Sequence, residues 1–340
     1  MKITESYSRS CLSEIRTIMS TSSSSTYVSP RKVSVIITCY NYGPYLRLAI
    51  ESVLAQIYPE FEIIVVNDGS ADNTDEIMRQ YLSISKIKYI KQGNFGSSRA
   101  RNIGIRNAAG QFIAFLDADD IWEKQRLEEQ LPLFNDKKVG VVYSRMKVID
   151  QFGKEVSKIV KDPYRIPRSG NVTQHLFLAN FIPFSSVTVR RECLDRVGLF
   201  DESLKMGMDW DLLLRISPYY DFAFVDKPLI AYRIGHMGQL SRNFEERYRC
   251  EDKLIDNFLC NNPDLIPKPM LKRASINQCV GRGINCRHRN IHLSNRYFIK
   301  ALSRDMFAFS AYLGLLKNLI VLILGSTRYF HRRGRDPSRL

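Results

Sequence analysis

Residues 112–120 read FIAFLDADD, an apolar run that ends in three carboxylates within four positions. The apolar half has the composition of a short buried strand in a parallel sheet. The acidic half repels itself, so it costs stability unless water or a bound cation surrounds it. Carboxylates two positions apart in a turn can hold a hard cation, Mn²⁺ or Mg²⁺, that also contacts diphosphate oxygens. A solvated turn in which Asp120 caps the next helix explains the same residues, and the motif alone does not separate the two readings.

Outward from this motif, the preceding chain alternates between apolar strands and helical patterns. Runs rich in β-branched residues at 33–38, 61–66 and 87–90 are each followed by apolar residues that recur every three or four positions. This alternation predicts a doubly wound parallel sheet, in which ligands bind beyond the carboxyl ends of the strands. Polar clusters follow three of the strands directly, so we expect them to converge at one rim of the sheet. These clusters are residues 38–41, 67–70 and 117–120.

The rest of the chain is less regular, and it becomes helical from Phe244 onward. Composition predicts a disordered polar tail at 1–30, an α/β domain at 31–243 and a helical C-terminal extension at 244–340. Further strands are expected at 139–143, 186–190 and 222–225, and helices at 46–54, 73–82, 98–109, 125–134 and 209–217.

Single residues in the polar clusters have two readings each. Asp68 can accept hydrogen bonds from a nucleobase or hold an arginine, but Asp-Gly after a strand is also common turn chemistry. Thr38 and Tyr40 can frame a base or ribose, or can simply pack. Taken alone, these residues leave both readings open.

Four linked motifs resemble the inverting family 2 glycosyltransferases of GT-A fold. They are Val33–Asn41, Phe61–Thr74, Asn94–Ile105 and Phe115–Asp120, and the match spans roughly residues 32–240 in the order and spacing of that family. The resemblance implies a Rossmann-like mixed sheet flanked by helices, here with a helical C-terminal extension. It also implies sugar transfer from a nucleotide-diphosphate sugar, a UDP-sugar being favoured, to an acceptor hydroxyl.

The resemblance also implies roles for individual residues. Asp119 would bind the metal, with Asp117 on metal or ribose and His236 as a further candidate ligand; a lone loop histidine is, however, more often without such a role. No Gln-x-x-Arg-Trp motif follows, which favours transfer of a single sugar. The implied nucleotide-binding residues are Thr38, Tyr40, Asn41, Asp68, Arg101, Asp117 and Ala118.

The implied general base is Asp209, in the stretch Met208–Leu212. Met208 stands where the family usually has Glu, which leaves the base in place but alters how the acceptor is held. Trp210, Asp211 and Arg233 match positions near the acceptor or the diphosphate. The alternative for Asp209 and Asp211 is an acidic pair that the dipole of a helix N-terminus favours.

The formal net charge of +15 favours a polyanionic partner, and the seven cysteines, without a metal-ligand pattern, indicate free thiols in a reducing compartment. A basic nucleic-acid-binding protein is the competing reading, but the sequence has no binding module of that kind, so no nucleic-acid partner is expected. A third reading is a nucleotide-sugar-binding protein without catalysis. The retained Asp117, Asp119 and Asp209 argue against it.

The C-terminal region combines an apolar segment at 306–325 with an arginine-rich end. Lys317 and Asn318 interrupt the segment, so residues 306–340 are expected to attach peripherally to a membrane rather than to span it. Packing on the domain is the alternative. We therefore expect a cytoplasmic protein at the inner face of the plasma membrane, with a glycan or lipid-linked acceptor.

Overall fold

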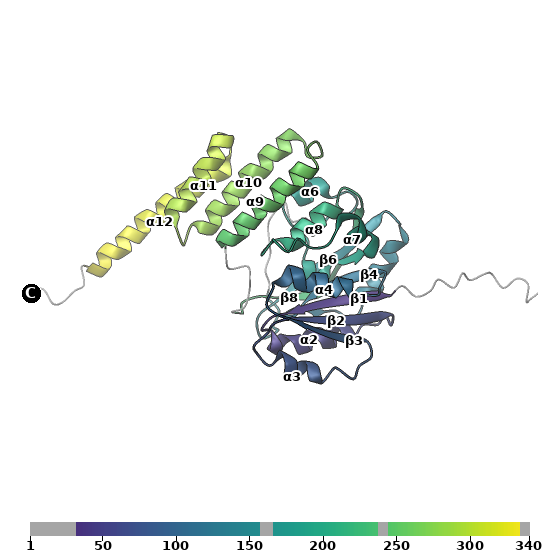
Figure 1. Cartoon of the computed structure of the whole chain (residues 1–340). Helices are drawn as coiled ribbons and strands as arrows, with labels where there is room; N and C mark the ends of the chain where they lie inside the picture. The colour runs from purple at the N-terminus through teal and green to yellow at the C-terminus, as the bar shows by residue number, and fades with distance from the viewer. Residues whose placement is uncertain (1–31, 157–165, 237–243, 334–340) are drawn as a thin grey trace, which may run out of the picture. The chain divides into compact units, whose positions relative to one another are not determined.

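The computed structural model describes residues 32–156, 166–236 and 244–333. The polar tail predicted at 1–30 lies outside the described residues. All the predicted strands and helices fall within the described residues (Figure 1). The basic end of the chain is described only in part.

A mixed sheet with strand order β3-β2-β1-β4-β7-β6-β8-β5 forms the centre of the fold (Figure 1). The strands β3, β2, β1 and β4 run parallel, as predicted, and β7 then pairs antiparallel to β4 and to β6. The sheet is therefore mixed rather than wholly parallel. The strands are β1 Val33–Cys39, β2 Phe61–Asp68, β3 Ile87–Gln92, β4 Phe112–Asp117, β5 Ile121–Trp122, β6 Val139–Ile149, β7 Thr188–Arg190 and β8 Asp221–Arg233.

The strand register aligns the carboxyl ends of β1, β2 and β4. Thr38 of β1 pairs with Asp117 of β4, and Cys39 pairs with Asn67 of β2. All eight residues of β2 are buried, as expected for a strand covered on both faces. The predicted convergence of the polar clusters at one rim is confirmed.

Helices cover both faces of the sheet, and four predicted helices differ in extent. Those predicted at 73–82 and 98–109 end earlier, at Arg79 and Arg106. The one predicted at 46–54 begins earlier, with Pro44 in its first turn, where a missing N–H has no cost. The one predicted at 125–134 is split, because Pro132 lacks the N–H needed to continue it, and a 3₁₀ turn follows. The helices are α2 Gly43–Leu54, α3 Thr74–Arg79, α4 Ser97–Arg106, α5 Arg126–Gln130, α6 Thr173–Leu178, α7 Arg191–Val197 and α8 Met208–Ile216, with 3₁₀ turns at Leu131–Asn135 and Phe184–Ser186.

Four further helices form the C-terminal region, as predicted from Phe244 onward. Leu254 and Phe258 of α9 join the main core beside α8, whereas Phe298 of α11 centres a smaller core of its own. In the described part of the chain, no helix combines the length and apolarity needed to cross a membrane. These helices are α9 Phe244–Asn261, α10 Lys268–Cys286, α11 Ile291–Arg304 and α12 Phe309–Arg333.

Candidate active site

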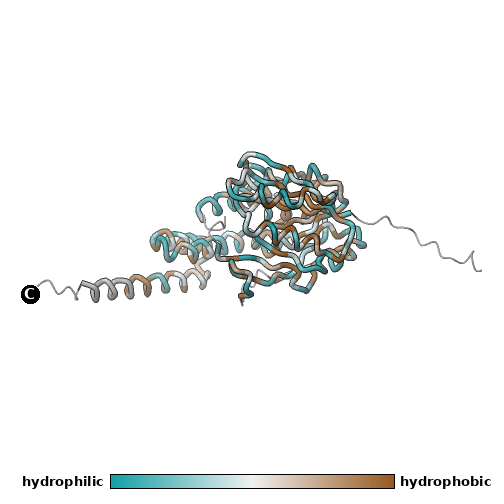
Figure 2. Tube along the Cα trace, turned by 90° about the horizontal axis from the view of Figure 1, so that it is seen from below, coloured by the Kyte–Doolittle hydropathy of each residue, from teal (hydrophilic) through white to brown (hydrophobic). Residues whose placement is uncertain are grey.

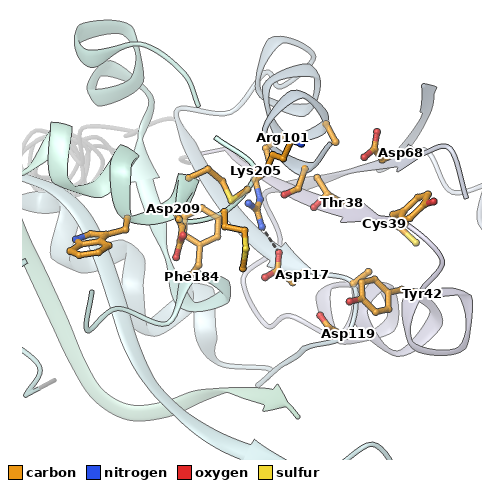
Figure 3. A pocket seen from close by; sticks show the side chains of 18 of the residues that line it. Thr38, Cys39, Tyr42, Asp68, Arg101, Asp117, Asp119, Phe184, Lys205 and Asp209 are labelled. Carbon is orange, nitrogen blue, oxygen red and sulfur yellow. Dashed lines mark hydrogen bonds and ion pairs between the residues drawn. The ribbon is translucent and has the colours of Figure 1, made fainter. Parts of the chain in front are cut away.

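A cavity of about 380 Å³ opens at the carboxyl ends of β1, β2 and β4 and extends to the start of α8 (Figure 3). It gathers most of the residues predicted from the sequence, from segments far apart in the chain. Four predicted residues are not among those that line it: Asn41, Asp211, Arg233 and His236. The predicted residues that line it are Thr38, Tyr40, Asp68, Arg101, Asp117, Ala118, Asp119, Asp209 and Trp210.

Asp117 is held by the arginine predicted to support the nucleotide pocket. Arg101 Nη2 donates to Asp117 Oδ1 over 2.6 Å, the contact drawn as a dashed line in Figure 3. The guanidinium lies 4.8 Å from the ring centre of Phe184 and 5.6 Å from that of Phe200. Since cation–aromatic contacts and the ion pair both restrain it, Arg101 fixes the orientation of Asp117.

Asp119 is paired with the histidine predicted as a further ligand. His236 Nε2 lies 2.8 Å from Asp119 Oδ2, and the imidazole stands edge-on to Tyr42. Burial, and then the charge of Asp117, raise the pKa of the Asp119 carboxyl. This close pair of acids therefore gains from any positive charge brought near it.

The two acids fit a cation that is shared with a bound diphosphate. Within the described residues, Arg101 and His236 engage one carboxylate oxygen each, and the second oxygen of Asp117 and of Asp119 has no side-chain partner. Among the residues that the structure describes, no three His, Cys, Asp or Glu side chains gather there into a full metal cage. Mg²⁺ and similar cations commonly take only one or two carboxylates and complete their shell with water and phosphate oxygens.

The third acid of the motif, Asp120, has a structural role. It is fully buried and accepts hydrogen bonds from Ser185 Oγ at 2.5 Å and from the backbone N–H of Arg233 at 2.9 Å. Burial raises the pKa of its carboxyl well above the usual range. The sequence alternative, that Asp120 caps the next helix, is wrong, because its oxygens join β8 to the acidic turn.

Arg233 supports this turn from behind. Its guanidinium donates to the backbone carbonyls of Asp119, at 2.8 Å, and Asp150, at 3.1 Å, and only 2 % of the residue is exposed. These bonds, and the ring of Tyr45 at 4.7 Å, hold the guanidinium within the protein, and its contact with the diphosphate stays a prediction.

Asp68 and Asn41 shape the loops at the ends of β2 and β1. Asp68 accepts from the backbone N–H groups of Phe95 and Gly96, both at 2.9 Å, so its carboxylate anchors the loop before α4. The Asn41 side chain accepts from Ala71 N–H at 2.8 Å. Each of these two polar side chains therefore has a structural role in its loop that requires no bound ligand.

At the far end of the cavity, Asp209 lies in the first turn of α8. Asn180 Nδ2 donates to Asp209 Oδ2 over 3.0 Å, and Asn180 Oδ1 accepts from the backbone N–H of Ile182. The Asn180 amide therefore has both ends engaged. Asp209 lines the cavity, and its Oδ2 is the oxygen that Asn180 engages.

The two neighbours of Asp209 in sequence differ from it. Trp210 lines the cavity and donates through Nε1 to the carbonyl of Leu176 at 2.7 Å. Asp211 is buried and accepts from Arg215 Nε at 2.9 Å and Nη2 at 2.8 Å. Asp209 and Asp211 both lie in the first turn of α8, and the Arg215 contacts tie Asp211 to its own helix.

Sequence reasoning missed several residues that line the cavity. Tyr42 and Tyr232 flank the acids, and burial together with the carboxylate charges raises the pKa of each phenol, so both hydroxyls stay protonated. Arg247 and Glu251 come from α9, beyond the boundary predicted at residue 243. Tyr232 precedes Arg233 in a stretch that resembles the family, and Met208 stands at the position where this chain departs from the family's Glu, so the sequence marks both. The other residues it does not mark are Cys39, Ser97, Ala100, Asn180, Phe184, Lys205, Met206 and Gly207.

The mixed sheet, with a cavity at its strand ends, has the GT-A fold of solved glycosyltransferases. The chain belongs to glycosyl transferase family 2, whose model matches residues 34–198. It is 39 % identical over 254 residues to an uncharacterized glycosyltransferase of Nostoc sp., covering 67 % of this chain and 76 % of that protein.

Solved structures agree on the fold. S. aureus TarS 1–349 in complex with UDP-GlcNAc matches with a TM-score of 0.62 and 20 % identity, over 84 % of this chain and 89 % of that one. The mannosyltransferase PcManGT from Pyrobaculum calidifontis, in complex with GDP-Man and Mn²⁺, matches with a TM-score of 0.56 and 18 % identity, over 89 % and 81 %. At such identities the likeness establishes the fold alone.

Proposed function

We propose that this glycosyltransferase is an inverting, metal-dependent enzyme that moves one sugar from a nucleotide-diphosphate sugar to an acceptor hydroxyl. The observation that carries the proposal is a single cavity lined by Asp117 and Asp119 at the strand ends and by Asp209 on α8. Two acids suit a cation and diphosphate, and the third suits a general base.

In the proposed reaction, Asp209 takes the proton of the acceptor hydroxyl as its oxygen attacks the anomeric carbon. The bond to the diphosphate breaks on the opposite face, so the configuration inverts. Asn180 holds Oδ2 of Asp209, which leaves Oδ1 to accept the proton. A bound divalent cation would supply positive charge to the departing diphosphate.

The proposed donor is a UDP-sugar. TarS binds UDP-GlcNAc and PcManGT binds GDP-Man with Mn²⁺, which supports a nucleotide-sugar donor and a divalent metal for this fold. The pocket end lined by Thr38, Tyr40 and Arg101 would hold the nucleotide. Transfer of one sugar is supported by the absence of a Gln-x-x-Arg-Trp motif from the sequence.

The proposed acceptor is a glycan or a lipid-linked molecule that is reached from the cytoplasm. The six described cysteines are free thiols, in keeping with a reducing compartment. Fractionation of cells that produce the full chain would test this cellular location. Recovery outside the cytoplasmic and inner-membrane fractions would contradict it.

The deciding experiment follows the full chain with nucleotide sugars in the presence of Mn²⁺, Mg²⁺ or EDTA. We expect a nucleotide sugar to raise the melting temperature, and turnover to be lost in EDTA and restored by added cation. Thermal stabilisation without hydrolysis or transfer would show a binding protein without catalysis. Turnover that EDTA leaves unchanged would overturn the metal dependence.

A further inference from the structure

The long helix α12 has two different faces, and both are largely apolar. The inward face packs against α10 and α11 through Ala311, Gly314 and Asn318, which recur at helical spacing and are buried. Gly314 lies directly against the ring of Phe298. The turns of this helix include hydrophobic segments, as Figure 2 shows.

A buried polar cluster fixes the rotation of α12 about its own axis. Arg287 Nε donates to Asn318 Oδ1 over 2.7 Å, and Asn318 Nδ2 donates to Ser294 Oγ at 2.8 Å and to Asn295 Oδ1 at 2.6 Å. Turning the helix would leave these groups buried without partners, which costs about 1–3 kcal/mol for each. Asn318, which interrupts the apolar segment in the sequence, therefore serves to seat the helix.

Seating the helix in this way presents its other face to solvent. Six large side chains on it are each between 45 % and 74 % exposed. A contiguous exposed apolar surface on a folded protein marks an interaction site. This outer face consists of Phe309, Tyr312, Leu313, Leu316, Leu319 and Ile320.

The charge of the C-terminal sequence favours an anionic occupant. Residues 268–340 contain fifteen Lys and Arg against two Asp and no Glu, an excess of 13 out of the net +15 of the chain. Five of these arginines follow residue 327 in the sequence, and the exposed Lys317 lies between Leu316 and Leu319 on α12. A second copy of the chain would bring the same positive charge to the contact, so self-association is disfavoured.

We propose that the outer face of α12 docks onto an anionic lipid bilayer, with the helix axis in the plane of the membrane. Apolar side chains on one face and cations beside them are the combination that binds the interface of such a bilayer. Crossing the bilayer would strip α12 from the Arg287–Asn318 cluster. This surface is separate from the cavity, so the proposal stands independently of the proposed function.

The test is sedimentation of the full chain with vesicles of phosphatidylcholine alone or mixed equally with phosphatidylglycerol. We expect binding to the anionic vesicles that weakens in high salt, and much weaker binding to the neutral ones. The variant Leu316→Glu with Ile320→Glu should lose about tenfold or more in affinity, because two apolar contacts are replaced by repelled charges. Leu82→Glu with Phe152→Glu, a matched change at exposed apolar residues elsewhere, should bind as the wild type does.

Three results would overturn the proposal. The first is equal binding of wild type to both vesicle types, and the second is equal binding of the outer-face variant and the control. The third is light scattering that shows a dimer which only the outer-face variant dissociates, since the occupant would then be a second copy. If circular dichroism shows the glutamate pair to be unfolded, Leu316→Gln with Ile320→Gln serves as the test.

Discussion

The sheet domain and the C-terminal helices use similar apolar residues but cover them to different degrees. In β2 every side chain is buried, and helices lie on both faces of the sheet. In α12 the inward face is buried, and the outer face is open at Phe309, Leu313 and Leu316. A mainly apolar segment is therefore buried on all sides in the sheet domain, but on one face only in the C-terminal helices.

The two regions also differ in what a buried or partly buried asparagine contacts. Asn180 engages Asp209, a residue that lines the cavity, whereas Asn318 engages Arg287 and two side chains inside the small core. Loss of the first should therefore appear in the rate of reaction, and loss of contacts around the second in stability.

The largest effect is expected for Asp209→Asn in the sheet domain. The amide keeps the shape of the side chain but cannot accept the proton, so transfer should fall by about 10²–10⁴-fold. Donor binding should survive, because Asp209 lies at the end of the cavity away from Thr38 and Asp68. Steady-state transfer and thermal shift with the donor measure the two properties.

The matched control for this variant is Asp195→Asn, on the exposed surface of α7 and outside the cavity lining. It should transfer sugar at the wild-type rate. Wild-type activity in Asp209→Asn would show that Asp209 is not the general base.

A smaller effect, on stability alone, is expected for Gly314→Ala in α12. The new methyl group would lie 2.4 Å from the ring atoms of Phe298, and such overpacking costs about 1–3 kcal/mol. Unfolding of the C-terminal helices, followed by circular dichroism in denaturant, should shift to lower denaturant. Donor binding should stay unchanged if the two regions divide their roles as described.

Gly281→Ala in α10 is the matched control. Nothing lies within 4 Å of its added methyl group, and alanine is the better helix former by about 1 kcal/mol, so this variant should be slightly stabilised. Equal effects of the two substitutions would show that Phe298 does not pack tightly against α12.

The sheet and half of the site could be predicted because their signals are local. Runs such as 61–66 are apolar throughout, as strands buried on both faces are, and Asp117 and Asp119 follow such a strand directly. Parallel strands then bring their ends together without further information. The resemblance to the family added Asp209, which no short pattern marks.

The rest could not be predicted because it depends on packing across distant segments. Asn180 and Lys205 lie in irregular loops with no periodicity, and Arg247 enters the cavity from a helix that composition alone assigns to another region. A sequence pattern also does not show which way a side chain turns. Arg233 turns toward backbone carbonyls, and Asp211 toward Arg215.

The smallest effect is expected for Asn180→Ala, and it decides whether this asparagine acts on the reaction or only on the fold. Its amide donates to Asp209 Oδ2 and so holds the carboxylate in one orientation, and its loss lets that carboxylate turn. We expect kcat to fall by about tenfold, in line with one hydrogen bond to a charged group. Asn180→Asp, which replaces the donor by a like charge beside Asp209, should lower kcat further. An unchanged kcat in both variants, with only the melting temperature lowered, would make Asn180 a structural residue like Asn318, and the contrast between the two regions would then rest on Asp209 alone.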